Sequence, residues 1–268
     1  VLGHFECQSS GLPEARFHRR NSGEGSVGGK ENDADFGRSP EKNMMGPLPS
    51  PQKKRPADLL LTRGTILTLT PGSKPISGGA LAIVDGRIAA VGANAHLENS
   101  FEAAQTLDAQ GGLIMPGLVN AHTHAAMSCF RGIADDLPLM EWLTRYIFPA
   151  ESKTDGDQVY WSTLLACAEM IRSGTTTFCD MYLFAGQVAQ AARDAGMRAF
   201  VGEVLYDFPS PNYGPLEKGF AYTEALINQW RGDSLIHTAV EPHALYTCSS
   251  DLLRRCRDLA GRYGVPMI

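Results

Sequence analysis

The chain has 268 residues, 43% of them hydrophobic, enough for one large domain or two ordinary ones with apolar cores. A formal net charge of -5 gives no electrostatic reason to expect nucleic acid or an anionic membrane as a partner. No apolar run reaches the length of a membrane span, and the first residues lack the apolar core of a secretory signal.

Six cysteines are scattered without forming a Cys-x-x-Cys pair, so neither a zinc knuckle nor a thioredoxin-type motif is predicted. Cys167, Cys179 and Cys248 lie in apolar stretches and are typical of small core residues in a reducing compartment. We therefore expect a soluble, cytoplasmic protein.

Residues 1–56 are rich in Gly, Ser, Pro and charged residues and show no hydrophobic period of 2 or 3.6. Such a segment cannot bury enough apolar surface to offset the entropy lost on ordering. We expect a disordered or non-native extension here, with Met44 or Met45 as an alternative start of the protein.

Residues 57–112 have the pattern of a small antiparallel sheet. Strand-like runs lie at 59–62, 65–69, 80–84 and 87–91. The last two flank Asp85-Gly86, a strong hairpin signal because a type I′ turn needs positive φ at both central residues. The sequence therefore predicts part of a small β domain in this segment.

Two histidines, His122 and His124, follow the apolar run 113–119. If this run is a strand, the two side chains project into the same space, because alternate residues of a strand share a face. Neutral imidazole is a common ligand of zinc and of iron. A bare His-x-His pair is a weak signal, and by itself it leaves a structural role for both histidines open.

Residues 113–268 alternate between strand and helix patterns. Helical patterns occur at 137–147, 155–172, 186–194, 216–230 and 251–263, and further strands are predicted at 175–181, 197–205, 235–243 and 265–268. Such an alternation predicts a parallel sheet built from βα units. A doubly wound α/β fold is the alternative, although no Gly-x-Gly-x-x-Gly follows any of these strands.

Three stretches around the histidine pair carry a family resemblance: Pro116-Gly117, Asn120-Ala-His-Thr-His-Ala-Ala-Met127 and Arg131-Gly-Ile-Ala-Asp-Asp-Leu-Pro-Leu-Met-Glu-Trp-Leu143. They resemble the amidohydrolase superfamily. Within it the chain is most similar, from about Ala57 to Ile268, to the 5'-methylthioadenosine/S-adenosylhomocysteine deaminases and their chlorohydrolase relatives.

The resemblance implies an α/β fold, a (β/α)₈ TIM-type barrel, preceded by a small β-sandwich that far C-terminal residues complete. Only the first half of a barrel is predicted here, with residues 113–268 ending after the helix of strand four and a stub of strand five. We therefore expect an N-terminal portion that is inactive alone. Open half-barrels can dimerise to bury their edges, so a homo-oligomer is among the expectations.

The resemblance further implies that His122 and His124 are metal ligands, with zinc as the expected metal and iron as the alternative. The family's remaining His and Asp ligands and its catalytic Glu are expected beyond residue 268. Glu151 matches a family Glu that accepts hydrogen bonds from both ribose hydroxyls. His243, in Glu241-Pro-His-Ala-Leu-Tyr-Thr-Cys248, matches a substrate-binding Pro-His-x-x-Tyr motif.

Members that bind the amino-acid tail of S-adenosylhomocysteine carry arginines where this chain has Glu203 and Pro215. A Glu cannot bind a carboxylate as Arg does, which favours methylthioadenosine or adenosine as substrate. Asp180 at the end of strand two is interpreted as either a support for the site or a residue that bonds the local backbone. His237 is interpreted as a core or barrel-lining residue.

The function implied is metal-dependent hydrolytic deamination of an adenine nucleoside, namely 5'-methylthioadenosine, S-adenosylhomocysteine or adenosine, with release of ammonia. The His-x-Glu…Pro-Cys-x-x-Cys signature of cytidine-type deaminases is absent. The alternatives are an amidohydrolase or chlorohydrolase acting on a triazine or another heterocycle, and an inactive fragment or scaffold relative. The expected partner is a small-molecule nucleoside, not nucleic acid or a membrane.

Overall fold

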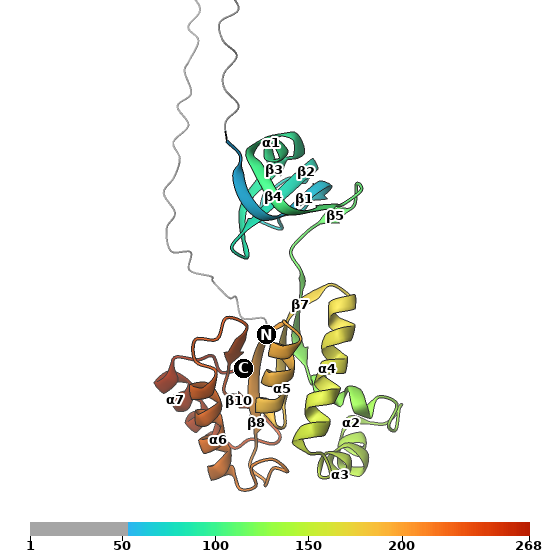
Figure 1. The fold of residues 1–268 in the computed structure, drawn as a ribbon. Helices are drawn as coiled ribbons and strands as arrows, with labels where there is room; N and C mark the ends of the chain where they lie inside the picture. The colour runs from blue at the N-terminus through green and yellow to red at the C-terminus, as the bar shows by residue number, and fades with distance from the viewer. Residues whose placement is uncertain (1–52) are drawn as a thin grey trace, which may run out of the picture. The chain divides into compact units, whose positions relative to one another are not determined.

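The computed structural model describes residues 53–268, so most of the extension expected at 1–56 lies outside the described residues. The described part contains two five-stranded sheets and the helices that accompany them (Figure 1). No helix within 53–268 is both long enough and apolar enough to cross a bilayer.

The first sheet has the order β3-β2-β1-β4, and β5 pairs with the far end of β1. Its elements are β1 (Arg55–Ile66), β2 (Ile76–Val84), β3 (Arg87–Ala93), α1 (Asn94–Ser100), β4 (Phe101–Asp108) and β5 (Leu113–Ile114). Asp85 and Gly86, between the antiparallel strands β2 and β3, have φ of 51° and 69°. The predicted hairpin is therefore confirmed, with the positive φ values that a type I′ turn requires.

Two features of the first sheet differ from the prediction. The runs 59–62 and 65–69 lie mostly within the single strand β1, whose pairing with β2 shifts at Gly64. Strand β4 was not predicted, because Phe101–Asp108 is largely exposed and lacks an apolar run. Residues 55–114 form one sheet with Leu97 of α1 in its core, and the β-sandwich stays a prediction.

The second sheet is parallel throughout and has the order β10-β8-β7-β6, with β9 also paired to β8. Its strands are β6 (Leu118–Thr123), β7 (Thr175–Tyr182), β8 (Arg198–Leu205), β9 (Ile236–Thr238) and β10 (Glu241–Pro242). The helices that connect or follow these strands are η1 (Ala125–Phe130), α2 (Leu139–Trp142), η2 (Leu143–Ile147), α3 (Phe148–Glu151), α4 (Gly156–Arg172), α5 (Ala185–Asp194), α6 (Leu216–Gln229) and α7 (Ser250–Tyr263).

Sequential parallel strands joined by helices confirm the predicted mixed α/β fold. The carbonyl oxygen of Val240 accepts from the backbone N–H of Ile268, and Val240 pairs in parallel with Met267. The end of the predicted strand 265–268 therefore lies beside the predicted strand 235–243, as expected. The run 113–119 is divided: β5 joins the first sheet, and β6 begins after Pro116-Gly117. Closure into an eight-stranded barrel stays a prediction.

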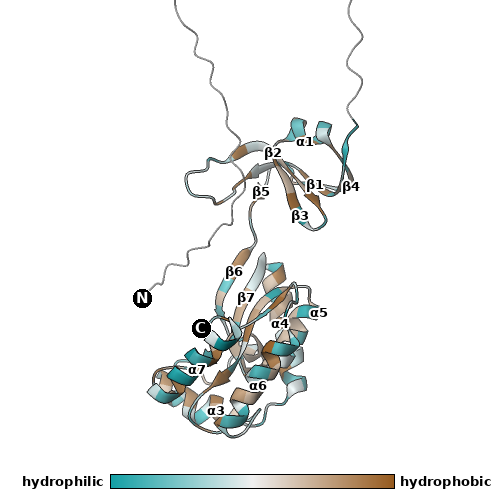
Figure 2. Cartoon of the chain, turned by 90° about the vertical axis from the view of Figure 1, so that its left-hand side faces the viewer, coloured by the Kyte–Doolittle hydropathy of each residue, from teal (hydrophilic) through white to brown (hydrophobic). Residues whose placement is uncertain are grey.

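The core around the second sheet lies between its strands and the helices that connect them. Phe178, Val201 and Ile236 are fully buried on the strands and pack in one cluster with Val188 of α5 and Leu252 of α7. Figure 2 shows hydrophobic colours on the strands and hydrophilic colours on the outer faces of α6 and α7. This packing fixes the carboxyl ends of the parallel strands, where the candidate site lies.

Gly202 of β8 leaves room for the Glu241 side chain to lie directly against the sheet. A Cβ at this position would come within 2.6 Å of Glu241 Cγ and 2.8 Å of the Ala239 carbonyl oxygen. We expect Gly202→Ala to lower the free energy of unfolding by about 1–3 kcal/mol, because the packed neighbours must move. Urea denaturation of the full-length protein measures this effect.

Gly261→Ala is the matched control. Gly261 is exposed in α7 and its Cβ would meet no atom within 4 Å, so alanine should stabilise the helix by up to about 1 kcal/mol. A Gly202→Ala variant as stable as the wild type would contradict the close contact between β8 and Glu241.

Candidate active site

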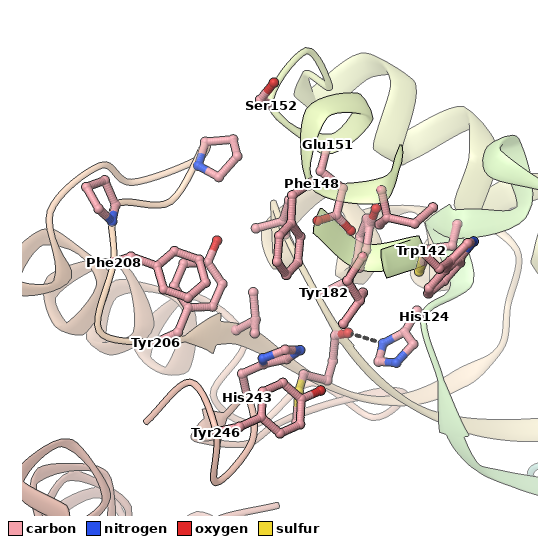
Figure 3. Close-up of a pocket in the computed structure, with 18 of the residues that line it drawn as sticks. His124, Trp142, Phe148, Glu151, Ser152, Tyr182, Tyr206, Phe208, His243 and Tyr246 are labelled. Atoms are coloured by element: carbon pink, nitrogen blue, oxygen red, sulfur yellow. Dashed lines mark hydrogen bonds between the residues drawn. The ribbon is translucent and has the colours of Figure 1, made fainter. Parts of the chain in front are cut away.

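A cavity of about 400 Å³ lies beyond the carboxyl ends of β6, β7, β8 and β10 (Figure 3). This is the edge at which barrel enzymes carry their active sites. Its walls are mainly apolar and aromatic, with a few polar groups between them. The residues that line it include His124, Trp142, Phe148, Glu151, Tyr182, Tyr206, Phe208 and His243.

The predicted metal ligands lie together at the end of β6. The ring centroids of His122 and His124 are 5.1 Å apart, with their planes at 79°. Between Asn120 and Thr123, β6 advances three residues while β7 advances two, so a bulge interrupts the ladder at the pair. His124 lines the cavity, whereas His122 is exposed beside it.

The tautomer of His124 follows from its hydrogen bond. Its Nδ1 lies 2.6 Å from the carbonyl oxygen of Met181, drawn as a dashed line in Figure 3. A carbonyl oxygen only accepts, so Nδ1 carries the proton and Nε2 keeps its lone pair. Burial first, and the neighbouring His122 to a smaller extent, lower the pKa of His124. The ring is therefore held neutral, as a metal ligand must be.

The described residues supply an incomplete metal site. Within 53–268, no cluster of three or more His, Cys, Asp or Glu side chains could hold one ion. A catalytic zinc usually has three protein ligands. Two neighbouring imidazoles, one of them with Nε2 free and Nδ1 bonded to a carbonyl, fit part of that set.

Glu151 ends α3 and is half-buried in the cavity wall beside Tyr182 (Figure 3). Burial raises the pKa of its carboxyl group, and the Tyr182 hydroxyl partly offsets this rise. No Lys or Arg among the described residues lines the cavity to pair with this carboxylate. The carboxylate therefore has free acceptor capacity toward a ligand in the cavity.

His243 follows β10 and faces the same cavity. Its Nδ1 lies 2.8 Å from Thr247 Oγ1, and that hydroxyl donates to the carbonyl oxygen of Ala244. The hydroxyl therefore accepts from His243 Nδ1–H, which leaves Nε2 as an acceptor. Burial is the larger cause that lowers the pKa of His243, and the proximity of the second imidazole, His124, lowers it further. The structure thus brings His124, Glu151 and His243 to one space.

An aromatic wall was not predicted from the sequence. The rings of Tyr206 and Phe208 stack with centroids 3.9 Å apart at 15°, and Phe148 faces Phe208 at 6.2 Å. Tyr206 directly follows β8, and Tyr182 ends β7. Their positions at the ends of predicted barrel strands were the available signal. No Lys or Arg is among the described residues that line the cavity.

Several other residues named from the sequence lie away from this cavity. Glu203 is buried and accepts from the backbone N–H of Ala185, and Pro215 is exposed before α6. Neither residue lines the cavity. The cavity wall after β8 is formed by the aromatic residues Tyr206 and Phe208 instead. His237 is exposed and stacks on Phe200, with the ring centroids 5.0 Å apart.

Two buried acids, Asp180 on β7 and Glu241 on β10, have raised pKa values. Burial raises the pKa of Asp180 to about 7, while its bond from the Ala125 N–H acts in the opposite direction. Burial also raises the pKa of Glu241 well above its usual range, helped by the charges of Asp180 and Glu203. Within the described part of the chain neither oxygen of Glu241 has a hydrogen-bond partner. Burial without a hydrogen-bond partner among residues 53–268 therefore favours the neutral form of the Glu241 carboxyl.

Comparison with known proteins identifies the family. The sequence model described as "Amidohydrolase family" matches residues 113–268. The 5-methylthioadenosine/S-adenosylhomocysteine deaminase of Syntrophobacter fumaroxidans is 64% identical over 212 residues, which are 79% of this chain and 48% of that protein. The chain spans about half the length of the curated relatives it matches.

Two solved structures resemble the described fold. An adenosine deaminase from Xanthomonas campestris with bound zinc superposes with a TM-score of 0.78 at 40% identity, over 80% of this chain and 49% of that one. A zinc complex of atrazine chlorohydrolase from Arthrobacter aurescens gives 0.69 at 18% identity, over 78% and 52%, which supports a common fold alone. The family match covers more than half of the sequence, and the chain therefore belongs to the amidohydrolase family.

Proposed function

We propose that the protein is a metal-dependent hydrolytic deaminase that releases ammonia from an adenine nucleoside. The observation that supports this most is the meeting of His124, Glu151 and His243 in one aromatic-walled cavity at the strand ends. The similarity to deaminases of methylthioadenosine, S-adenosylhomocysteine and adenosine agrees with it.

In this proposal His122 and His124 hold a divalent metal ion, zinc with iron as the alternative. When bound, the metal supplies a nucleophile at neutral pH by lowering the pKa of water. The Met181 carbonyl holds the Nδ1 proton of His124 and so directs Nε2 to the ion. No residue within 53–268 is proposed to transfer the proton.

The other cavity residues would bind the nucleoside. The Glu151 carboxylate can accept from both hydroxyls of a ribose. His243 offers Nε2 as a further acceptor, since Thr247 fixes its Nδ1 proton. The stacked pair of Tyr206 and Phe208 offers an apolar surface to a purine ring or to an uncharged 5' substituent.

The same cavity disfavours a charged 5' substituent. The amino-acid tail of S-adenosylhomocysteine carries a carboxylate, and no Lys or Arg among residues 53–268 lines the cavity to pair with it. Methylthioadenosine and adenosine are therefore the favoured substrates. A reducing, cytoplasmic location belongs to the proposal, supported by free thiols at Cys129, Cys167, Cys179, Cys248 and Cys256.

Ammonia release by the zinc-loaded full-length protein tests this assignment. We expect kcat/KM to be at least about tenfold higher for methylthioadenosine than for S-adenosylhomocysteine. The reason is that binding the carboxylate of the tail without a charged partner typically costs about 1.4 kcal/mol or more. Release from no adenine nucleoside, together with turnover of an aminated or chlorinated triazine, would favour the alternative heterocycle hydrolase. Equal values for the two nucleosides would contradict the proposed selection against a charged tail.

A further inference from the structure

Two consecutive residues at the end of β7 hold the backbone that carries His124. The carbonyl oxygen of Met181 accepts from His124 Nδ1 at 2.6 Å. The carboxylate of Asp180 accepts from the backbone N–H of Ala125, the residue after His124, at 2.5 Å. Asp180 is 1% exposed, so water does not compete for this bond.

The backbone at this point needs such a support. The bulge between Asn120 and Thr123 interrupts the regular pairing of β6 with β7 just before His124. His124 itself has φ −124° and ψ 73°, outside the regular strand conformation, and its side chain caps no N–H of η1. The ladder therefore does not fix the ring of His124, and the bonds from Asp180 and Met181 do.

Asp180 is also a costly residue to bury. Its Oδ2 has no hydrogen-bond partner among the described residues, so one oxygen of a buried carboxylate is left unpaired. A side chain that served packing alone would not need the carboxylate. The oxygen that is used, Oδ1, reaches a backbone 55 residues away in sequence.

The next strand provides an internal comparison. Glu203 of β8 accepts from the N–H of Ala185, the first residue of α5, at 2.8 Å. Both acids are buried, and each holds the chain where it leaves the preceding strand. The loop held by Glu203 carries no candidate metal ligand. Glu203 therefore represents the purely structural form of the same contact.

We propose that Asp180 is a positioning residue for the metal site. Through the Ala125 N–H, it fixes the backbone of His124 so that His124 Nε2 and the His122 ring face one ion. This inference rests on the proposed function, because it assumes that His122 and His124 bind a metal.

The test measures zinc affinity and fold stability separately in the full-length protein. Zinc affinity comes from competition with a chromogenic chelator, and stability comes from the urea midpoint. We expect Asp180→Ala to weaken zinc binding about tenfold or more, as loss of a supporting hydrogen bond does at other metal sites. Asp180→Asn keeps an acceptor oxygen and should largely restore the affinity.

Glu203→Ala is the matched control, expected to lower the urea midpoint while the zinc affinity per folded molecule is unchanged. If Asp180→Ala does not fold, Asp180→Ser provides the comparison, since its hydroxyl is too short to reach the Ala125 N–H. Asp180 variants that bind zinc as tightly as the wild type, or no more weakly than Glu203→Ala, would overturn the inference.

The wild type and His124→Ala separate this inference from the proposed function. If the wild type binds no zinc, or His124→Ala binds it unchanged, the proposed metal site fails. If the wild type binds zinc, His124→Ala does not, and Asp180→Ala behaves as the wild type, the positioning role alone fails.

Discussion

Replacing His122 or His124 with alanine in the full-length protein is expected to remove the bound metal and to reduce deamination to the background rate. Their rings lie 5.1 Å apart on one side of β6, and the removal of either leaves a catalytic zinc short of the three protein ligands that it usually has. Plasma emission spectrometry measures the metal content, and ammonia release from methylthioadenosine measures the activity.

His237→Ala is the control for this experiment. His237 lies on strand β9, stacks on Phe200 and does not line the cavity. We expect its metal content and activity to match those of the wild type. Metal near one equivalent per chain with undiminished turnover in His122→Ala or His124→Ala would disprove the assignment of that histidine.

Glu151→Gln is expected to lower kcat/KM for a ribonucleoside by about ten- to a hundredfold, because loss of a charged hydrogen-bond acceptor typically costs roughly 1.5–3 kcal/mol. The loss should be much smaller for the 2'-deoxy analogue, which already lacks one of the two hydroxyls. Steady-state kinetics with methylthioadenosine and its 2'-deoxy form give the two values.

Glu141→Gln is a matched control on the same helical segment. Glu141 pairs with Arg145 at 2.7 Å and does not line the cavity, so neither substrate should be affected. Equal losses on both substrates in Glu151→Gln would mean that Glu151 does not contact the ribose diol.

Local sequence signals predicted many of the helix ends around the second sheet. Asp155 caps α4 by accepting from the Gln158 N–H, and Ser249 caps α7 in the same way with Leu252. Gly264 ends α7 at a φ of 66°. These features depend on neighbouring residues, so the sequence carries them directly. Strand alternation also predicted that His122 and His124 lie close together, although the structure places a bulge in the ladder at this point.

Other features depend on contacts between distant segments. An apolar run such as 113–119 fits either sheet, and only tertiary pairing assigns β5 to one and β6 to the other. The gap between β9 and β10 and the bulge before His124 are likewise set by neighbouring strands. Asp180 has no local signal for its bond to Ala125, 55 residues away.

The aromatic wall shows a similar limit. The stack of Tyr206 on Phe208 forms where the chain leaves β8, and Phe148 faces it from α3. No period or motif links these residues, because the folded strand ends bring them together. The candidate site could therefore be located by its histidines, but its apolar walls required the structure.

Anomalous diffraction above the zinc absorption edge shows directly whether His122 and His124 hold a metal ion beside a bound nucleoside. The crystals contain the full-length protein with zinc and the deaminated nucleoside. We expect one peak at about 2.0–2.1 Å from an imidazole nitrogen of both His122 and His124, with the ribose hydroxyls on Glu151. A zinc peak away from these two histidines, or a nucleoside bound outside the cavity, would disprove the proposed metal and substrate sites.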